Sequence, residues 1–221
     1  MPEIVVFLGP SVSRDKAEQI LPASQADFRP PAKRGDIFRA AEDGAKIICL
    51  IDGVFFQECS VAHKEVLYAL EKGAKVIGAS SMGALRASEL DVYGMIGVGE
   101  IYQAYRSGRL VSDDEVALIF DPFTWEPRSE PLVNIRFNLE LAELRGIIDA
   151  AARNELFRCA QSQYFPERTY ERMMRSAEGR VAAKTLQRLR EFLKDEGRDF
   201  KMEDAMAALR RTKEMAEGGC K

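Results

Sequence analysis

Two neighbouring serines stand where a catalytic nucleophile is often found. Ser80 and Ser81 follow the apolar run 75–79 and precede the helical stretch GALRASEL, so they occupy a turn between a strand and a helix. The order Ser81-Met82-Gly83 resembles part of the G-x-S-x-G nucleophile elbow, although the preceding glycine, Gly78, is one residue farther away than that motif requires. A serine at such a turn could attack a carbonyl carbon while amide groups of the helix start hold the oxyanion. The simpler interpretation is that both hydroxyls only cap the helix.

A lysine near the start of the preceding helix could act as the base. The stretch SVAHKEVLYALEKG predicts a helix with Ser60 as its N-cap and Gly73 at its end. Lys64 falls in the first turn, where the helix dipole disfavours a positive charge and so favours the neutral amine that accepts a proton. An exposed Lys64, or one paired with Glu65, would have no such role. For His63, the single histidine, a structural role is the default interpretation.

The surrounding pattern predicts a sheet that brings these groups to one edge. The apolar runs 4–8, 46–51 and 75–79 are rich in β-branched residues, and each is followed by a helical segment. This alternation is typical of an α/β fold with a parallel sheet and flanking helices, a Rossmann-like arrangement. Ligands of such folds bind outside the carboxyl ends of the strands, so Ser81 and Lys64 should face one crevice and could form a Ser-Lys pair.

Other polar groups belong to the same predicted edge. The turn Gly9-Pro10-Ser11 precedes a helix and could hold an anion by its N–H groups, and Asp52 follows the second strand. Prolines 30–31 fix an extended loop in which Lys33 and Arg34 form either a solvated basic surface or a clamp for substrate.

The second half of the chain changes to a helical period. The run 116–120 predicts a fourth strand, and helical segments dominate from residue 134 onward. We therefore expect an α/β core over residues 1–133 and a helical region over 134–221 that packs on the core or contacts a partner. The glycine-rich stretch 93–99 lacks a G-x-G-x-x-G placement after a strand, which argues against a dinucleotide site.

Composition narrows the class of protein further. The 221 residues carry a net charge of -3, which argues against a general nucleic-acid binder because neutralising phosphates requires a basic surface. Four cysteines without C-x-x-C spacing and a single histidine predict no metal site, and we expect no cofactor. The first residues lack the basic region of a signal peptide, and no apolar run reaches membrane-spanning length. We expect a cytoplasmic protein.

Several stretches together resemble one known family. They are FLGPSVSR, FRPPAKRGDIFRA, IDGVFFQ, SVAHKEVLYAL, GASSMGALRASEL and GMIGVGEIYQAYRSGRL. In this order they resemble the core domain of TfuA-like proteins, over residues 3 to 121. The remaining helical part carries no motif of this kind.

The resemblance implies a function in peptide backbone thioamidation. TfuA-like proteins accompany YcaO enzymes, which activate a backbone amide of a substrate peptide or protein so that sulfur replaces its oxygen. The family is associated with hydrolysis of a thiocarboxylated, ubiquitin-like carrier of the ThiS type, which releases sulfide, and with a Ser-Lys pair. Carried over to this sequence, the pair is Ser81 as nucleophile and Lys64 as base. The substrate-binding candidates are Lys33, Arg34, Asp52, His63, Ser80, Gly83 and Arg86.

Alternatives stay open at this point. Ser11, Ser60 or Ser80 could be the nucleophile, and Lys33 could be the base. The protein could instead be a non-catalytic adaptor that recruits peptide and carrier to YcaO, with Phe55 and Phe56 at the contact. A third hypothesis is an anion-binding α/β module that uses residues 9–11 and Arg34.

Overall fold

The chain forms two compact units in the computed structural model, which describes residues 3–55 and 59–218. The first unit contains residues 1–113 and 201–221, and the second contains residues 114–200. The domain boundary predicted after residue 133 therefore falls inside the second unit, and the last helix, α10 (Phe200–Gly218), contributes nearly all of its length to the first.

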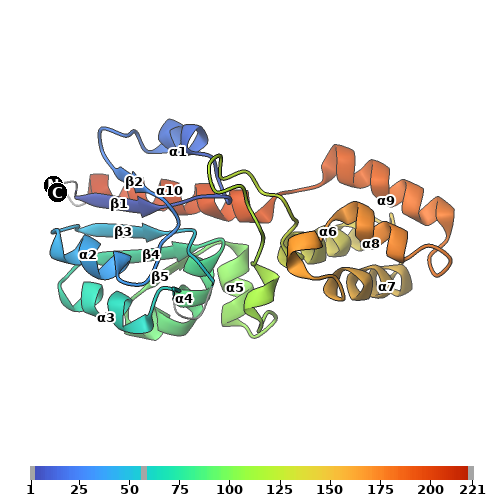
Figure 1. Ribbon diagram of the computed structural model, residues 1–221, viewed down its shortest axis with the longest axis horizontal. Coiled ribbons are helices and arrows are strands. Elements are labelled where there is room, and N and C mark those ends of the chain that lie inside the picture. Colours follow the sequence, from blue (N-terminus) through green and yellow to red (C-terminus); the bar gives the residue numbers. More distant parts are fainter. Residues whose placement is uncertain (1–2, 56–58, 219–221) are drawn as a thin grey trace. The chain divides into compact units, whose positions relative to one another are not determined.

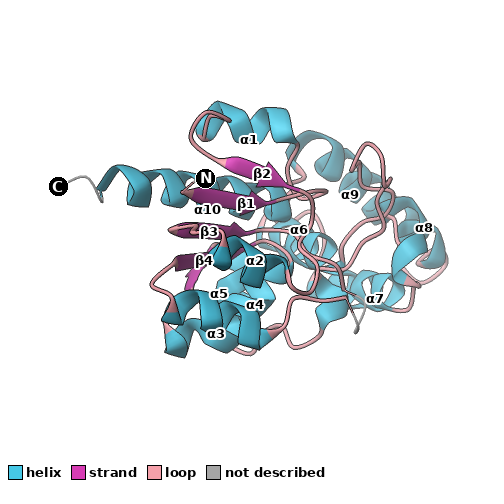
Figure 2. Ribbon diagram, turned by 60° about the vertical axis from the view of Figure 1, so that its left-hand side comes forward, coloured by secondary structure: helices cyan, strands magenta, loops and turns pink. Residues whose placement is uncertain are grey.

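A parallel sheet of five strands is the centre of the first unit. Its strands lie in the order β2-β1-β3-β4-β5, and all of them run in the same direction (Figure 2). They are β1 (Ile4–Phe7), β2 (Asp27–Arg29), β3 (Ile47–Leu50), β4 (Lys75–Ala79) and β5 (Ile96–Val98). The predicted class, a parallel sheet with flanking helices followed by a helical region, is confirmed. In this strand order the topological switch point lies between β1 and β3, where ligands of doubly wound sheets bind.

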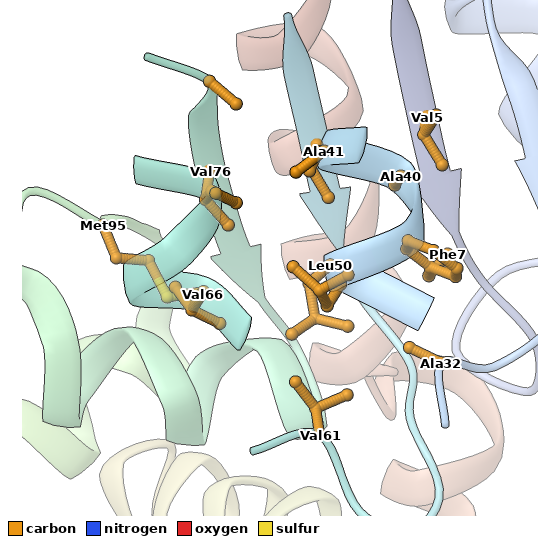
Figure 3. Packing of buried hydrophobic residues seen from close by; sticks show 14 of the residues in the cluster. Val5, Phe7, Ala32, Ala40, Ala41, Leu50, Val61, Val66, Val76 and Met95 are labelled. Atoms are coloured by element: carbon orange, nitrogen blue, oxygen red, sulfur yellow. The ribbon is translucent and has the colours of Figure 1, made fainter. Parts of the chain in front are cut away.

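Helices cover both faces of this sheet (Figure 1). Alternate strand residues point to opposite faces, because the side-chain period of a strand is two. Val5, Ile48 and Val76 pack in one apolar layer with α2 (Asp36–Glu42), α3 (His63–Glu71) and α4 (Met82–Leu90), as Figure 3 shows for part of the layer. Val6, Cys49 and Ile77 pack on the other face with α1 (Arg14–Ile20) and α10. The unit also contains η1 (Asp91–Tyr93) and α5 (Glu100–Arg106), and the boundary with the second unit falls inside η2 (Asp113–Glu115).

Three strand assignments differ from the sequence-based expectation. β2 was expected as a loop, but among the described residues it is an edge strand that pairs with β1 alone. A short, charged segment can form such a strand because one of its edges is not covered by another strand. β5 was expected as part of a glycine-rich connection, yet it pairs with β4. The predicted strand 116–120 is wrong: the segment forms a turn and an extended loop with an isolated bridge between Phe120 and Pro127. Its Val116 is buried, so the apolar run reflects burial without strand pairing.

The second unit is helical and has an apolar core of its own. It contains α6 (Leu132–Leu144), α7 (Ala150–Gln161), η3 (Phe165–Glu167), α8 (Tyr170–Ser176) and α9 (Ala183–Glu196). The core is formed mainly by Ile135, Leu139, Leu156, Cys159, Met173, Leu189 and Phe192. Arg168 is buried and forms an ion pair with Asp114 at 2.7 Å. Within the described residues, no helix combines the length and apolar character needed to cross a membrane.

Candidate active site

Ser81 lies on the turn that the sequence predicted, between β4 and α4. Its side chain is 2% exposed. Ser81 occupies the N-cap position of α4, but within the described residues its hydroxyl makes no capping hydrogen bond. The preceding Ser80 has φ +66, a left-handed conformation that is uncommon outside glycine and often marks a functional turn. The alternative that Ser81 merely caps the helix therefore finds no support in the hydrogen bonds.

The hydroxyl of Ser81 instead contacts a lysine from the far end of the sequence. Lys201 Nζ donates a hydrogen bond to Ser81 Oγ at 3.1 Å, across 120 residues. Lys201 lies on α10 and its side chain, like that of Ser81, is 2% exposed. A serine and a lysine within hydrogen-bond reach in a buried site are the arrangement of an activated nucleophile and its base.

Lys64, the lysine predicted for this role, is exposed on the first turn of α3. The helix starts later than expected, with Ala62 as its N-cap in place of Ser60. The buried Glu65 accepts a hydrogen bond from the Ala62 N–H at 3.1 Å and another from the Gly35 N–H at 2.7 Å. The lysine that the structure brings to Ser81 is Lys201, and a catalytic pairing of Ser81 with Lys64 stays a prediction.

A chain of three buried side chains lies next to this pair. Ser80 Oγ donates to Ser11 Oγ at 2.9 Å, and Ser11 Oγ donates to Asp52 Oδ1 at 2.6 Å. The other carboxylate oxygen of Asp52 accepts the N–H groups of Gly9 at 2.9 Å and Ser11 at 3.1 Å. These hydrogen-bonded side chains join the ends of β1, β3 and β4, and so fix the turn that carries Ser81.

The same contacts bear on the anion-binding hypothesis. The N–H groups of Gly9 and Ser11 were expected to hold an external anion, but they already bind the Asp52 carboxylate. An internal anion thus occupies the turn after β1. Asp52, predicted as a substrate-binding residue, is 2% exposed and accepts three hydrogen bonds from protein donors.

Gly83 permits close packing of α4 against the sheet. A Cβ at this position would lie 1.8 Å from the carbonyl oxygen of Leu50. The Gly83 N–H donates to the Ile51 carbonyl oxygen at 3.2 Å, and the Ser81 N–H donates to the Ala79 carbonyl oxygen at 2.7 Å. Two amides that were expected to hold a ligand oxyanion or to border it are therefore engaged within the protein.

Arg86 and His63 converge on one carboxylate at the side of the site. Arg86 Nη1 donates to Glu89 Oε2 at 2.7 Å, and His63 Nε2 lies 2.8 Å from the same oxygen. Arg86 also donates to the Val61 carbonyl oxygen at 2.8 Å and is nearly buried. These contacts fasten the loop before α3 to α4, which is a structural role for both predicted binding residues.

Lys33 and Arg34 are exposed on the loop that precedes α2. The loop runs beside the end of β3, because the Ala32 N–H donates to the Asp52 carbonyl oxygen at 2.9 Å and the Ala32 carbonyl oxygen accepts the Val54 N–H at 3.0 Å. The two cations thus stand on a fixed backbone near the carboxyl edge of the sheet, and a clamp at this place stays a prediction.

Comparison with known proteins identifies the family. A family model described as TfuA-like protein matches residues 52–169, which is more than half of the chain. The chain belongs to the TfuA-like proteins. A search of curated proteins found no match. The matched segment of this TfuA-like protein includes Ser80 and Ser81 and ends before Lys201.

Lys201 is the main residue of the candidate site in this TfuA-like protein that the sequence did not predict. A signal for it exists in α10. Residues at helical spacing form one buried stripe, and they are Lys201, Asp204, Ala205, Ala208, Leu209 and Thr212. Charged residues at positions of an apolar stripe indicate buried polar contacts, because an uncompensated buried charge is costly.

The other groups considered from the sequence are metal-binding side chains, two aromatic residues and Ser60. The described residues contain no group of three or more His, Cys, Asp or Glu side chains arranged for a metal ion. Phe55 is partly buried against the apolar layer of α2 and α3, and Phe56 lies outside the described residues. Ser60 follows this segment, half-buried on the loop before α3.

Proposed function

We propose that this TfuA-like protein is a serine hydrolase that cleaves the thiocarboxylate of a ThiS-type carrier and supplies sulfide to a partner YcaO enzyme. The observation that carries the proposal is the 3.1 Å contact between Lys201 Nζ and Ser81 Oγ in a buried site. Family membership supports the choice of carrier and of YcaO partner, and the geometry supports the choice of nucleophile and base.

The reaction begins with a neutral Lys201. Burial away from water favours the neutral form of an amine, and the neutral amine can take the hydroxyl proton of Ser81. Ser81 Oγ then attacks the thiocarboxylate carbon. The carbon–sulfur bond breaks, the proton on Lys201 passes to the sulfur, and the carrier remains attached to Ser81 as an ester.

Water completes the cycle. Lys201 accepts a proton from the attacking water, the ester bond breaks, and the proton returns to Ser81 Oγ. The sum is one thiocarboxylate and one water converted to one carboxylate and one hydrogen sulfide. The Met82 N–H at the start of α4 is the candidate donor for the oxyanion, because the neighbouring amides of Ser81 and Gly83 donate to Ala79 and Ile51.

The site favours a narrow acyl group. Ser81 is 2% exposed, so a folded protein surface cannot reach its hydroxyl, whereas an extended C-terminal tail is slender enough to approach it. The exposed Lys33 and Arg34 at the same edge would attract acidic groups on the body of the carrier.

The test is sulfide release from a thiocarboxylated carrier in the absence of YcaO. We expect Ser81→Ala and Lys201→Met to lower the rate at least ~100-fold, the usual scale for loss of an acid-base or nucleophilic group. Methionine fills the volume of lysine without a charge. Lys64→Met is the matched control, because Lys64 is exposed, and it should release sulfide at close to the wild-type rate.

Other outcomes distinguish the alternatives. Loss in Lys64→Met with an active Lys201→Met would restore the pair predicted from sequence. If the wild type releases no sulfide but still increases thioamidation by YcaO, the adaptor hypothesis replaces the hydrolase.

A further inference from the structure

Lys201 shares its face of α10 with a buried carboxylate that the proposed reaction does not use. Asp204 follows Lys201 by three residues, which places both side chains on one side of the helix. The side chain of Asp204 is 5% exposed. Its Oδ1 accepts the Glu100 N–H at 2.9 Å, and its Oδ2 accepts the Ile101 N–H at 2.8 Å. Asp204 therefore caps the start of α5 from a different element of the fold.

The start of α5 is shaped to receive this carboxylate. The N-cap residue of α5 is Gly99, which has no side chain to satisfy the first N–H groups. Gly99 adopts φ +98, and a Cβ at this position would lie 2.1 Å from the carboxyl carbon of Asp204. A side chain at position 99 would therefore displace the Asp204 carboxylate from its place. The glycine and the aspartate thus form a matched contact.

This contact fixes the position of α10 along its own axis. Elsewhere α10 packs on the sheet through the buried side chains Ala205, Ala208 and Leu209. Apolar contacts of small side chains have little directional preference, whereas two hydrogen bonds to one carboxylate permit a single register. A shift of about 1 Å would move the Lys201 amine beyond hydrogen-bond reach of Ser81. Burial raises the pKa of Asp204 to about 6, so the fold retains this carboxylate at an energetic cost.

We propose that Asp204 is a positioning residue that holds Lys201 Nζ against Ser81 Oγ through its cap on α5. The inference rests on the proposed Ser81-Lys201 pair. Asp204 acts only through Lys201 and contacts neither the substrate nor the reacting atoms, so its removal should matter only while Lys201 is present.

The experiment measures the rate at which Ser81 reacts with a small alkyl fluorophosphonate. The reaction forms a bond between Ser81 Oγ and phosphorus and releases fluoride, and intact-protein mass reports it without any carrier. The full-length wild type should be labelled, and Ser81→Ala should not. Absence of labelling in the wild type would overturn the proposed nucleophile itself, which separates that failure from failure of the positioning role.

The decisive comparison is a double-mutant cycle. We expect Asp204→Asn to lower the labelling rate at least ~10-fold, and Lys201→Met to lower it at least as much. The double variant Lys201→Met with Asp204→Asn should react at the rate of Lys201→Met alone, because a residue that acts through another adds nothing once the other is gone. Asparagine keeps the volume and one acceptor oxygen of Asp204, so the fold is retained.

A control and an independent readout complete the test. Glu214→Gln removes an exposed carboxylate on the same helix that pairs with Arg211, and its labelling rate should equal that of the wild type. Hydrogen exchange at the amides of Glu100 and Ile101 should quicken in Asp204→Asn and Asp204→Ala. Labelling of Asp204→Asn at the wild-type rate would overturn the inference. The inference would also be overturned if adding Asp204→Asn to Lys201→Met slowed labelling by the same factor as Asp204→Asn slows it in the wild type.

Discussion

Ser11 Oγ donates a 2.6 Å hydrogen bond to Asp52 Oδ1, which joins the ends of β1 and β3 across 41 residues. Both side chains are almost fully buried. The contact lies at the switch point of the sheet, where related folds admit a ligand. In this TfuA-like protein the place is filled by an internal carboxylate, and the proposed Ser81-Lys201 pair lies one strand farther on, at the end of β4.

Asp52→Ala should destabilise the protein by about 3 kcal/mol or more. The change leaves the buried N–H groups of Gly9 and Ser11 without an acceptor, and each unsatisfied donor costs about 1–3 kcal/mol. Urea denaturation followed by circular dichroism measures the loss. Glu71→Gln, at an exposed carboxylate near the end of α3, should stay within about 0.5 kcal/mol of the wild type. Equal midpoints for Asp52→Ala and Glu71→Gln would contradict the prediction.

Gly83→Ala should prevent stable folding or cost more than about 3 kcal/mol, because the added methyl group would lie 1.8 Å from the Leu50 carbonyl oxygen. Gly44→Ala is the matched comparison. Gly44 has φ +86 and open space around it, so alanine there should cost only about 1–2 kcal/mol of backbone strain. Thermal unfolding of the two variants measures the contrast, and the prediction fails if Gly44→Ala unfolds at the lower temperature.

The stability of the first unit should depend on pH through Asp204. Burial raises the pKa of Asp204 from 3.8 to about 6, with Glu100 and Glu203 adding smaller repulsions. The folded state therefore binds more protons than the unfolded chain between these values. The contribution to stability is fully present below pH 3.8 and is lost as the pH rises through about 6, by at most about 3 kcal/mol.

Urea titrations of the wild type and Asp204→Asn between pH 4 and pH 7 would measure this effect. Other acids titrate in both proteins, so the informative quantity is the difference between the slopes of unfolding free energy against pH. A constant difference in unfolding free energy, caused by the altered cap on α5, does not affect this comparison. The free energy of unfolding of the wild type should fall relative to that of the variant as the pH rises. Parallel curves would show that the buried carboxylate titrates at its ordinary value.

Arg168→Met should destabilise the helical unit by about 3 kcal/mol, because Asp114 would lose its buried cation. The Arg168 guanidinium also donates to the Ala160 and Gln163 carbonyl oxygens at 3.3 Å. Arg168→Lys should restore little, since a single ammonium cannot reproduce these divergent hydrogen bonds. The exposed ion pair of Arg172 with Glu167 provides the control, and Arg172→Met should cost less than about 1 kcal/mol. Hydrogen exchange in α7 and chemical denaturation would measure both.

The parts of the fold that sequence predicted well are those that local pattern determines. The apolar runs of β1, β3 and β4 are buried on both faces of a parallel sheet, and such strands are continuous in hydrophobicity. Edge strands lack this signature, which explains why β2 and β5 were missed. The run 116–120 was predicted as a strand but is not one. Its Val116 is buried without pairing in a sheet, so the apolar pattern reflects burial alone.

Of the two residues in the candidate pair, only Ser81 could be predicted from the sequence, and the reason is again local pattern. The location of Ser81 follows from a strand, a turn and a helix that are contiguous in the chain. Lys201 reaches Ser81 only through the packing of α10 on the sheet, and no local rule links positions 120 residues apart. Lys64 was the nearest lysine with a suitable helical position, but its side chain faces solvent.

The return of α10 to the first unit also sets an order of events during synthesis. Ser81 and the sheet that holds it emerge from the ribosome long before Lys201, and the whole of residues 114–200 is made in between. Domains tend to fold as they emerge, so the helical unit can form on a chain whose α/β unit still lacks its last helix. A nascent chain would consequently carry Ser81 without Lys201, and the hydrolytic activity that we propose would begin only after translation has passed the helical unit.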